Sequence, residues 1–258
     1  MDQNELRELE NRCIQEQPPA CAAACPVHLD ARAVMAEVAR GDFTAAAKIL
    51  KKSIPFPGII SRICDHPCQQ RCKRGQAGDP IQVGALERAC VTNPGRRPPV
   101  QVLPARGKQV AILGSGLSSL TAAFDLGRKG YEVFIIEPGQ NLGRHLESLY
   151  NGVLLQEVLQ AELAVFSQMR VQSRLGQKIA PDILAALAES FQAVYVGLDA
   201  GLPGHWDFQP PPDPLTLATG RPGVFVGGGQ QADGSWSPVM QSAQGRQAAT
   251  SMDRYVQN

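Results

Sequence analysis

Two groups of cysteines in the first third of the chain have the residue types and spacing of a metal-binding site. The first group, "CAAACP", begins at Cys21, and the second, "CDHPCQQRC", begins at Cys64; within both groups three residues separate successive cysteines. Thiolate sulfur is a soft ligand that suits zinc and iron-sulfur clusters. Seven cysteines, an odd number, favour metal or redox chemistry over a framework of disulfides.

The spacing favours an iron-sulfur cluster over zinc. Zinc sites mostly use CxxC pairs with a second matching pair, which this sequence lacks. Clusters are held by thiolates from several loops, commonly with a proline after the last cysteine of a run, as Pro26 follows Cys25. Cys90 lies in a predicted helix and is expected to be a small buried residue. His66 is expected at the surface, and the other histidines form no spaced set.

A glycine-rich turn forms the second candidate site. "QVAIL" predicts a short buried strand, "GSGLSS" a tight turn and "LTAAFDLGRKG" a helix, and the strand "YEVFIIE" then ends at Glu137. Gly114 permits the turn, Gly116 allows backbone to approach a pyrophosphate, and Ser119 is small enough for the third position. The helix N-terminus adds partial positive charge for phosphates, and Glu137 can accept hydrogen bonds from a ribose. The pattern predicts a dinucleotide site.

Length and charge limit the other classes. At 258 residues with 43% hydrophobic residues, the chain can bury one or two cores, and a net charge of +1 argues against a dedicated nucleic-acid binder. The acidic N-terminus predicts neither a signal peptide nor a transit peptide, and no stretch predicts a membrane span. We therefore expect a cytoplasmic protein.

These sites require two different scaffolds. Short helices joined by cysteine-bearing loops are predicted over 1–93, with Asp30 and Asp42 as helix starts and Gly41 as a helix end. Residues 94–107 are rich in proline and predict a linker. Residues 108–258 predict an α/β domain that closes with a long helix. The fold class is therefore α+β multidomain, an all-α iron-sulfur domain followed by a Rossmann-like α/β domain.

Together these motifs resemble the glutamate synthase small (beta) subunit family of iron-sulfur flavoproteins. The stretches that carry the resemblance are "RCIQEQPPACAAACPVHLD", "GIISRICDHPCQQRCKRG", "PIQVGALERA" and the glycine turn. The family includes the corresponding regions of dihydropyrimidine dehydrogenase and of the transhydrogenase large subunit. The resemblance implies a helical domain with two 4Fe-4S clusters and a following FAD domain.

The resemblance also assigns cluster ligands. One cluster would take three cysteines and Glu87; the outer cluster would take three more and Glu16, where the family usually has cysteine. Because a carboxylate is a harder ligand than a thiolate, one cluster is expected and the second depends on Glu16. The implied ligands are Cys25, Cys64, Cys68 and Glu87 for the first, and Cys13, Glu16, Cys21 and Cys72 for the outer cluster.

The FAD half departs from the family pattern. Arg144 replaces the second glycine of a pair, and Gly229 stands where the family has an aspartate that binds the flavin. The final helix matches a segment whose N-terminus faces the flavin. The candidate nucleotide-binding residues are Gly114, Gly116, Leu117, Ser118, Ser119, Glu137, Gly143, Arg144, Gly228, Gly229, Val239 and Met240.

One complete module of the family is absent from the sequence. Between "AVYVGLDAG" and "DPLTLATGRPGVF" the family inserts an NAD(P)H domain, and here about two dozen proline-rich residues bridge the gap without a second GxGxxG. The resemblance then implies an electron-transfer subunit with 4Fe-4S clusters and FAD, in complex with a hydrogenase, formate dehydrogenase, sulfite reductase or similar subunit. No general acid, base or nucleophile is identified. Two alternatives stay open: a cluster-carrying docking module with a degenerate FAD site, and a free-standing enzyme with a reductant such as ferredoxin.

Overall fold

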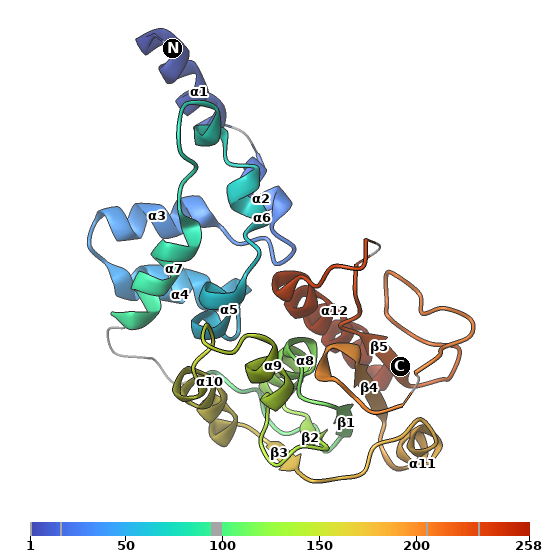
Figure 1. The fold of residues 1–258 in the computed structure, drawn as a ribbon. Helices are drawn as coiled ribbons and strands as arrows, with labels where there is room; N and C mark the ends of the chain where they lie inside the picture. Colours follow the sequence, from blue (N-terminus) through green and yellow to red (C-terminus); the bar gives the residue numbers. More distant parts are fainter. Residues whose placement is uncertain (1, 16, 94–99, 205, 232) are drawn as a thin grey trace. The chain divides into compact units, whose positions relative to one another are not determined.

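The computed structural model describes residues 2–15, 17–93, 100–204, 206–231 and 233–258. The chain divides into two compact units, Met1–Pro98 and Pro99–Asn258 (Figure 1). Each is described by itself. Glu16 and 94–99, the first part of the predicted linker, lie outside the described residues.

The first unit consists of short helices without a strand among its described residues. Local signals fix several helix ends: the carboxylate of Asp30 accepts from the backbone N–H of Ala33, and that of Asp42 accepts from Ala45, as the sequence predicts. Gly41 has a left-handed φ of +78°. The elements are α1 (Gln3–Gln15), α2 (Ala20–Ala24), α3 (Ala31–Ala39), α4 (Phe43–Ser53), α5 (Pro57–Ile63), α6 (Pro67–Gln70), η1 (Lys73–Gln76) and α7 (Val83–Thr92).

A small apolar core holds these helices together. Leu50 of α4, Phe56 and Ile59 are almost wholly buried, and so is Val34 of α3. Burying such side chains contributes about 1.5–3 kcal/mol each. The sequence predicted cysteines in the loops between helices, but they lie within the helices or directly at helix ends, so this core fixes where the thiols lie.

The second unit is built on a parallel sheet of five strands in the order β3-β2-β1-β4-β5. This order is typical of a doubly wound nucleotide-binding fold, with the crevice at the carboxyl ends of β1 and β4. The predicted α/β fold is confirmed. The strands are β1 (Gln109–Leu113), β2 (Glu132–Ile136), β3 (Val171–Arg174), β4 (Ala193–Gly197) and β5 (Val224–Gly227).

Helices cover both faces of this sheet. Alternate strand residues such as Leu113, Ile136 and Val196 face the cluster that includes Leu184 of α11. On α12, Gly245 allows the close approach to α8, because an added Cβ would lie 2.2 Å from the Ser118 carbonyl oxygen. The remaining elements are α8 (Leu117–Arg128), α9 (Arg144–Leu149), α10 (Gln156–Leu163), η2 (Ala164–Gln168), α11 (Ile183–Ser190), η3 (Leu198–Ala200) and α12 (Pro238–Gln257).

The described part of the linker is attached to the second unit. Residues 100–107 form neither helix nor strand, but the Leu103 N–H donates to the Arg128 carbonyl over 2.8 Å, and the Arg106 N–H donates to the Gly130 carbonyl over 3.0 Å. This segment therefore packs against the end of α8.

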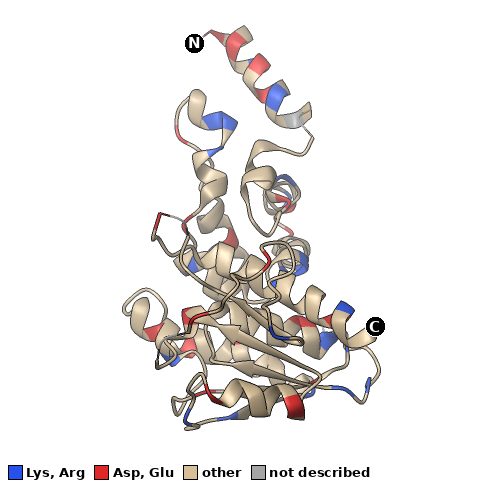
Figure 2. Ribbon diagram, turned by 90° about the vertical axis from the view of Figure 1, so that its right-hand side faces the viewer, with Lys and Arg blue, Asp and Glu red and all other residues tan. Residues whose placement is uncertain are grey.

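Charge is mixed over the molecule. Figure 2 shows Lys and Arg interspersed with Asp and Glu in both units, consistent with the net charge of +1. Of the helices in the described ranges, none has the length and apolar character needed to cross a membrane.

Candidate cluster and nucleotide sites

All seven cysteines lie in the first unit, and none of them forms a disulfide. Six of them fall into two groups of three, which differ in the neighbours that affect the pKa of each thiol; Cys90 belongs to neither group.

The deeper group brings Cys25, Cys64 and Cys68 close to Glu87. Cys25 follows α2, Cys64 ends α5, Cys68 lies in α6 and Glu87 lies in α7. Burial raises the pKa of Cys25 and of Cys64, and the Glu87 carboxylate raises both further. Burial raises the pKa of Cys68 to about 12, with Glu87 and Cys25 as the next causes. Four potential ligands from four separate segments therefore meet in one place.

The Glu87 carboxylate is buried in this group with one oxygen that has no hydrogen bond among the described residues. Its side chain is 4% exposed, and its Oε2 atom has no hydrogen bond within the described part of the chain. Burial raises its pKa to about 7, while the Arg88 guanidinium acts in the opposite direction. An orphaned buried carboxylate oxygen is costly unless a cation or donor faces it. A cluster bound by these thiols would supply that positive charge, so the residues fit the group.

The outer group consists of Cys13, Cys21 and Cys72. Burial raises the pKa of Cys21, and the nearby thiols of Cys13 and Cys72 raise it further. These three cysteines also line a common hollow together with Cys68. The fourth implied ligand, Glu16, lies outside the described residues.

The thiols do not form a tight site for a single metal ion. Among the described residues, no group of three Cys, His, Asp or Glu side chains has the arrangement needed to hold one ion. A tetrahedral zinc with Zn–S bonds of about 2.3 Å needs its sulfurs within roughly 4 Å of one another.

The other two residues weighed as ligands have structural roles. Cys90 is completely buried in α7, as the sequence predicts. His66, expected at the surface, is partly buried: its ring lies over Gly84, where an added Cβ would be 2.2 Å from Cε1. Burial lowers the pKa of His66. Packing against α7 explains this position.

In the second unit, the glycine turn joins β1 to α8 at the carboxyl edge of the sheet. Gly114 has a φ of +83°, and an added Cβ would lie 2.2 Å from the Cβ of Ala200. Both its conformation and its surroundings therefore require glycine. Ser119 is completely buried, and its hydroxyl lies 2.0 Å from a Cβ built on Gly197. Ser119 thus fills the position where helix and sheet pack most closely.

Glu137, at the end of β2, belongs to a hydrogen-bonded chain. Its Oε2 accepts from the Ser115 hydroxyl over 2.6 Å, and its Oε1 accepts from the Gly139 N–H over 2.8 Å. The Ser115 Oγ in turn accepts from the Gly143 N–H over 2.8 Å. This chain holds the carboxylate beside the turn, where a ribose would lie in a dinucleotide fold.

Asp199 is a site residue that the sequence analysis missed. Its Oδ2 accepts from the Ser118 N–H over 2.8 Å, and its Oδ1 accepts from the Ser118 hydroxyl over 2.6 Å. The side chain is 3% exposed, and burial raises its pKa to about 6 despite these hydrogen bonds. The available signal was an acid directly after β4, the strand whose carboxyl end faces the crevice.

Comparison with known proteins follows this division of the chain. Residues 1–96 match the family described as dihydropyrimidine dehydrogenase domain II, 4Fe-4S cluster, and residues 112–170 match the NAD(P)-binding Rossmann-like domain. The glutamate synthase [NADPH] small chain of Mycobacterium tuberculosis is 30% identical over 145 residues, which cover 55% of this chain and 30% of that protein. The chain is thus similar to part of a glutamate synthase small chain, which is consistent with the resemblance that the sequence motifs indicate.

Other relatives have different names. The NADPH-Fe(3+) oxidoreductase subunit beta of Geobacter sulfurreducens is 28% identical over 200 residues, 72% of this chain and 29% of that protein. The NAD-dependent dihydropyrimidine dehydrogenase subunit PreT of Escherichia coli is 29% identical over 203 residues, 74% of this chain and 48% of that protein. The chain thus spans less than half the length of these relatives.

The first unit is a 4Fe-4S domain, and the second is a Rossmann-like domain of the kind that binds flavin or nucleotide. Leu117 and Gly228 are buried, while Arg144 is exposed at the start of α9. A Cβ built on Gly229 would meet only the Leu198 side chain, at an ordinary 3.6 Å. At the start of α12, Val239 is buried and the Met240 N–H donates to the Ser237 hydroxyl.

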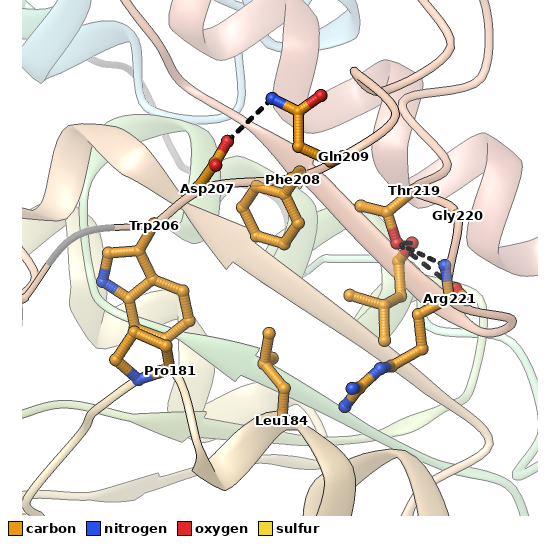
Figure 3. Close-up of a pocket in the computed structure, with 10 residues that line it drawn as sticks. Pro181, Leu184, Trp206, Asp207, Phe208, Gln209, Thr219, Gly220 and Arg221 are labelled. Atoms are coloured by element: carbon orange, nitrogen blue, oxygen red, sulfur yellow. Dashed lines mark hydrogen bonds between the residues drawn. The ribbon is translucent and has the colours of Figure 1, made fainter.

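The proline-rich segment between β4 and β5 packs against the sheet. The sequence analysis described it only as a bridge across the gap, yet Trp206 and Phe208 are partly buried against the core cluster. Together with Leu184 and Arg221 they line a hollow of about 300 Å³ (Figure 3). The segment is therefore a structured cover for β4 and β5 and not a free tether.

Proposed function

We propose that the chain is an electron-transfer subunit that carries 4Fe-4S clusters and FAD within a larger redox complex. The observation that carries the proposal is the gathering of buried thiols around the unpartnered Glu87 in a unit that matches a 4Fe-4S domain. Residues 1–93 would be the cluster domain, 94–107 the linker and 108–258 the FAD domain. A buried thiolate site with a surrounding apolar shell suits electron transfer, because burial and hydrogen bonds set the reduction potential.

Two groups of ligands support two clusters. Cys25, Cys64, Cys68 and Glu87 would hold one; Cys13, Cys21 and Cys72 would hold the other, with Glu16 as its fourth ligand. The residues' own contribution is to exclude water and to hold the thiol sulfurs at fixed positions. The burial that raises the pKa of Cys21 and Cys25 also disfavours free thiolates, so cluster binding and thiol deprotonation are expected to be coupled.

FAD is the nucleotide that we propose for the second unit. A flavin supplies both one-electron and two-electron chemistry when bound. Glu137 and the turn at Gly114 are placed to bind its adenosine part. The sequence holds one glycine turn, so we propose that this chain has no NAD(P)H site of its own, although several relatives carry NADPH or NAD in their names.

The partners would be catalytic subunits of a cytoplasmic redox complex. A relative from Moorella thermoacetica, 28% identical over 203 residues, is named NADP(+)-dependent formate dehydrogenase subunit beta. That name supports a partner of the formate dehydrogenase kind. A hydrogenase or sulfite reductase partner is proposed from the family resemblance of the sequence alone.

The test is an absorption spectrum of protein purified without oxygen, before and after reduction, with iron and released flavin measured on the same sample. Broad iron-sulfur absorption with superimposed flavin bands, both bleached on reduction, would support the proposal. Protein without iron would refute it.

A docking module that carries clusters but no flavin is the second candidate. Asp199 favours this candidate because it accepts from the Ser118 N–H at the start of α8. Gly229 and Arg144 favour it because they depart from the family pattern for FAD binding. Iron in full amount without releasable flavin, even after gentle purification, would select this candidate.

A further inference from the structure

The space beside Gly116 is filled by the chain itself. Gly116 directly precedes α8, and in a dinucleotide fold the missing side chain of this glycine lets backbone approach a pyrophosphate. Here a Cβ built on Gly116 would lie 2.5 Å from the Cγ and Oδ1 atoms of Asp199. The Asp199 carboxylate therefore lies where a pyrophosphate group would approach.

The same carboxylate already uses the donors that an anion would need. The Ser118 N–H belongs to the first turn of α8, whose unpaired N–H groups and partial positive charge attract phosphates. This N–H and the Ser118 hydroxyl both donate to Asp199, over 2.8 and 2.6 Å. An incoming phosphate would meet occupied donors and a negative charge.

Asp199 is enclosed from the opposite side as well. Gly228 follows β5 in a left-handed conformation, and its added Cβ would lie 2.4 Å from the Asp199 Oδ1. The carboxylate thus lies between two of the glycines that the sequence analysis assigned to nucleotide binding. Burial raises the pKa of Asp199, because desolvation disfavours the charged carboxylate, while the hydrogen bonds from Ser118 act in the opposite direction.

Asp199 lies in a short turn with a glycine on each side. This turn, η3, is one turn of 3-10 helix between Gly197 and Gly201, and Gly201 has a φ of +62°. Glycines at both ends of a short turn can absorb a change in backbone angles more easily than other residues.

We infer that Asp199 is an internal anion that occupies the phosphate-binding end of α8 and competes with the pyrophosphate of a dinucleotide for Ser118. The inference rests on the proposed FAD site and goes beyond it, since it assigns the control of nucleotide affinity to one side chain. Dinucleotide binding then requires η3 to withdraw Asp199 from the helix, so the wild-type chain binds FAD weakly unless another molecule stabilises the withdrawn turn.

The experiment measures nucleotide affinity in four proteins with clusters intact: wild type, Asp199→Asn, Asp199→Gly and Glu189→Gln. Asp199→Asn keeps the size and an acceptor for Ser118 but removes the charge, and Asp199→Gly also removes the side chain, which leaves only the backbone of residue 199 beside Gly116. Glu189, exposed on α11, is the matched control for loss of one negative charge. Each protein is titrated without oxygen with FAD, with ADP-ribose, which shares the pyrophosphate, and with riboflavin, which has none; far-ultraviolet circular dichroism checks the fold.

We expect both Asp199 variants to bind FAD and ADP-ribose at least about tenfold more tightly than wild type, because two like charges within a few ångströms repel strongly. The affinity for riboflavin and the behaviour of Glu189→Gln should stay unchanged. Equal, tight FAD binding by wild type and variants would overturn the inference but leave the flavoprotein intact. No binding of FAD or ADP-ribose by any folded, iron-loaded protein would overturn both the inference and the FAD part of the proposed function.

Discussion

Two buried carboxylates, one in each unit, differ in how their oxygens are satisfied. Glu87 of the first unit has an oxygen without a partner among the described residues, whereas Asp199 of the second unit accepts two hydrogen bonds from Ser118. A buried acceptor without a partner costs more free energy than one that accepts hydrogen bonds, although burial of a charge is costly in both cases. The first site is therefore built for something from outside the chain, and the second is closed by the chain itself.

The largest expected effect is at the open site. Cys64→Ser should remove the cluster that faces Glu87, with loss of about half or more of the iron and a marked loss of stability of the first unit, because that site's binding energy is also folding energy. Iron per protein and the melting temperature check this. Cys90→Ala is the matched control: this cysteine is also buried but is not an assigned ligand, so its iron content should equal that of wild type. Full iron in Cys64→Ser would contradict the ligand assignment.

The outer group should respond separately. Cys21→Ser should remove the second cluster and about half of the iron, while Glu16→Cys should preserve or raise the iron content, because thiolate suits iron better than carboxylate does. Electron paramagnetic resonance of the reduced protein distinguishes the two clusters. An iron content in Cys21→Ser equal to that of wild type would show that the outer group binds no cluster.

At the closed site, Asp199→Asn should change how stability depends on pH. Burial raises the pKa of Asp199 from its ordinary value near 3.8 to about 6. The folded wild type then binds more protons than the unfolded chain between these values, so this group stabilises the fold below pH 4 and that contribution is lost as the pH rises through 6. Between pH 4 and pH 7, the free energy of unfolding of Asp199→Asn should rise relative to that of wild type by at most about 3 kcal/mol.

Denaturant unfolding at a series of pH values measures this difference. Other titratable side chains that face the turn include Tyr195 of β4, whose pKa burial raises further into the alkaline range, and His145 of α9, whose ring lies against Gly201. Tyr195 stays neutral over this window, and a His145→Gln variant separates the imidazole from the carboxylate. Parallel pH profiles for wild type and Asp199→Asn would show that Asp199 carries no buried charge.

The smallest effect tests the contact that closes the site. Gly116→Ala should destabilise the second unit by about 1–3 kcal/mol, because its Cβ would overlap Asp199. Gly229→Ala is the control, since its Cβ would meet only Leu198 at an ordinary 3.6 Å. In an Asp199→Gly background only part of the Gly116→Ala penalty should disappear, because the backbone carbonyl carbon of residue 199 would still lie 2.7 Å from the added Cβ; a double-mutant cycle would measure this part. An undiminished penalty would show that the side chain of Asp199 contributes nothing to the obstruction.

Sequence patterns predicted the parts of this molecule that local chemistry dictates. The caps at Asp30 and Asp42, the buried strands β1 and β2 and the turn at Gly114 all follow from short-range signals. Strand β3 was missed because Val171–Arg174 is short, polar and mostly exposed, so it has no hydrophobic alternation. Its place in the sheet depends on pairing with β2, which is a tertiary contact.

The candidate sites show the same limit. Cysteine spacing identified the thiols, and the resemblance linked them to Glu87. That the Glu87 Oε2 has no hydrogen bond among the described residues depends on how α7 packs, which the sequence does not give. Asp199 lies 81 positions after Ser118, so nothing local connects the two residues. An acid that follows a strand at the crevice can bind a ligand or replace one, and only the fold separates these roles.

The packing of Trp206 against the core cluster gives the molecule a built-in optical distinction between its units. Both tryptophans of the sequence, Trp206 and Trp236, belong to the second unit, whereas the proposed cluster ligands all belong to the first. Indole fluorescence would therefore report the unfolding of the nucleotide domain, and visible absorption would report the loss of clusters. Heating one sample while both signals are followed would show directly whether the two halves melt together or in sequence.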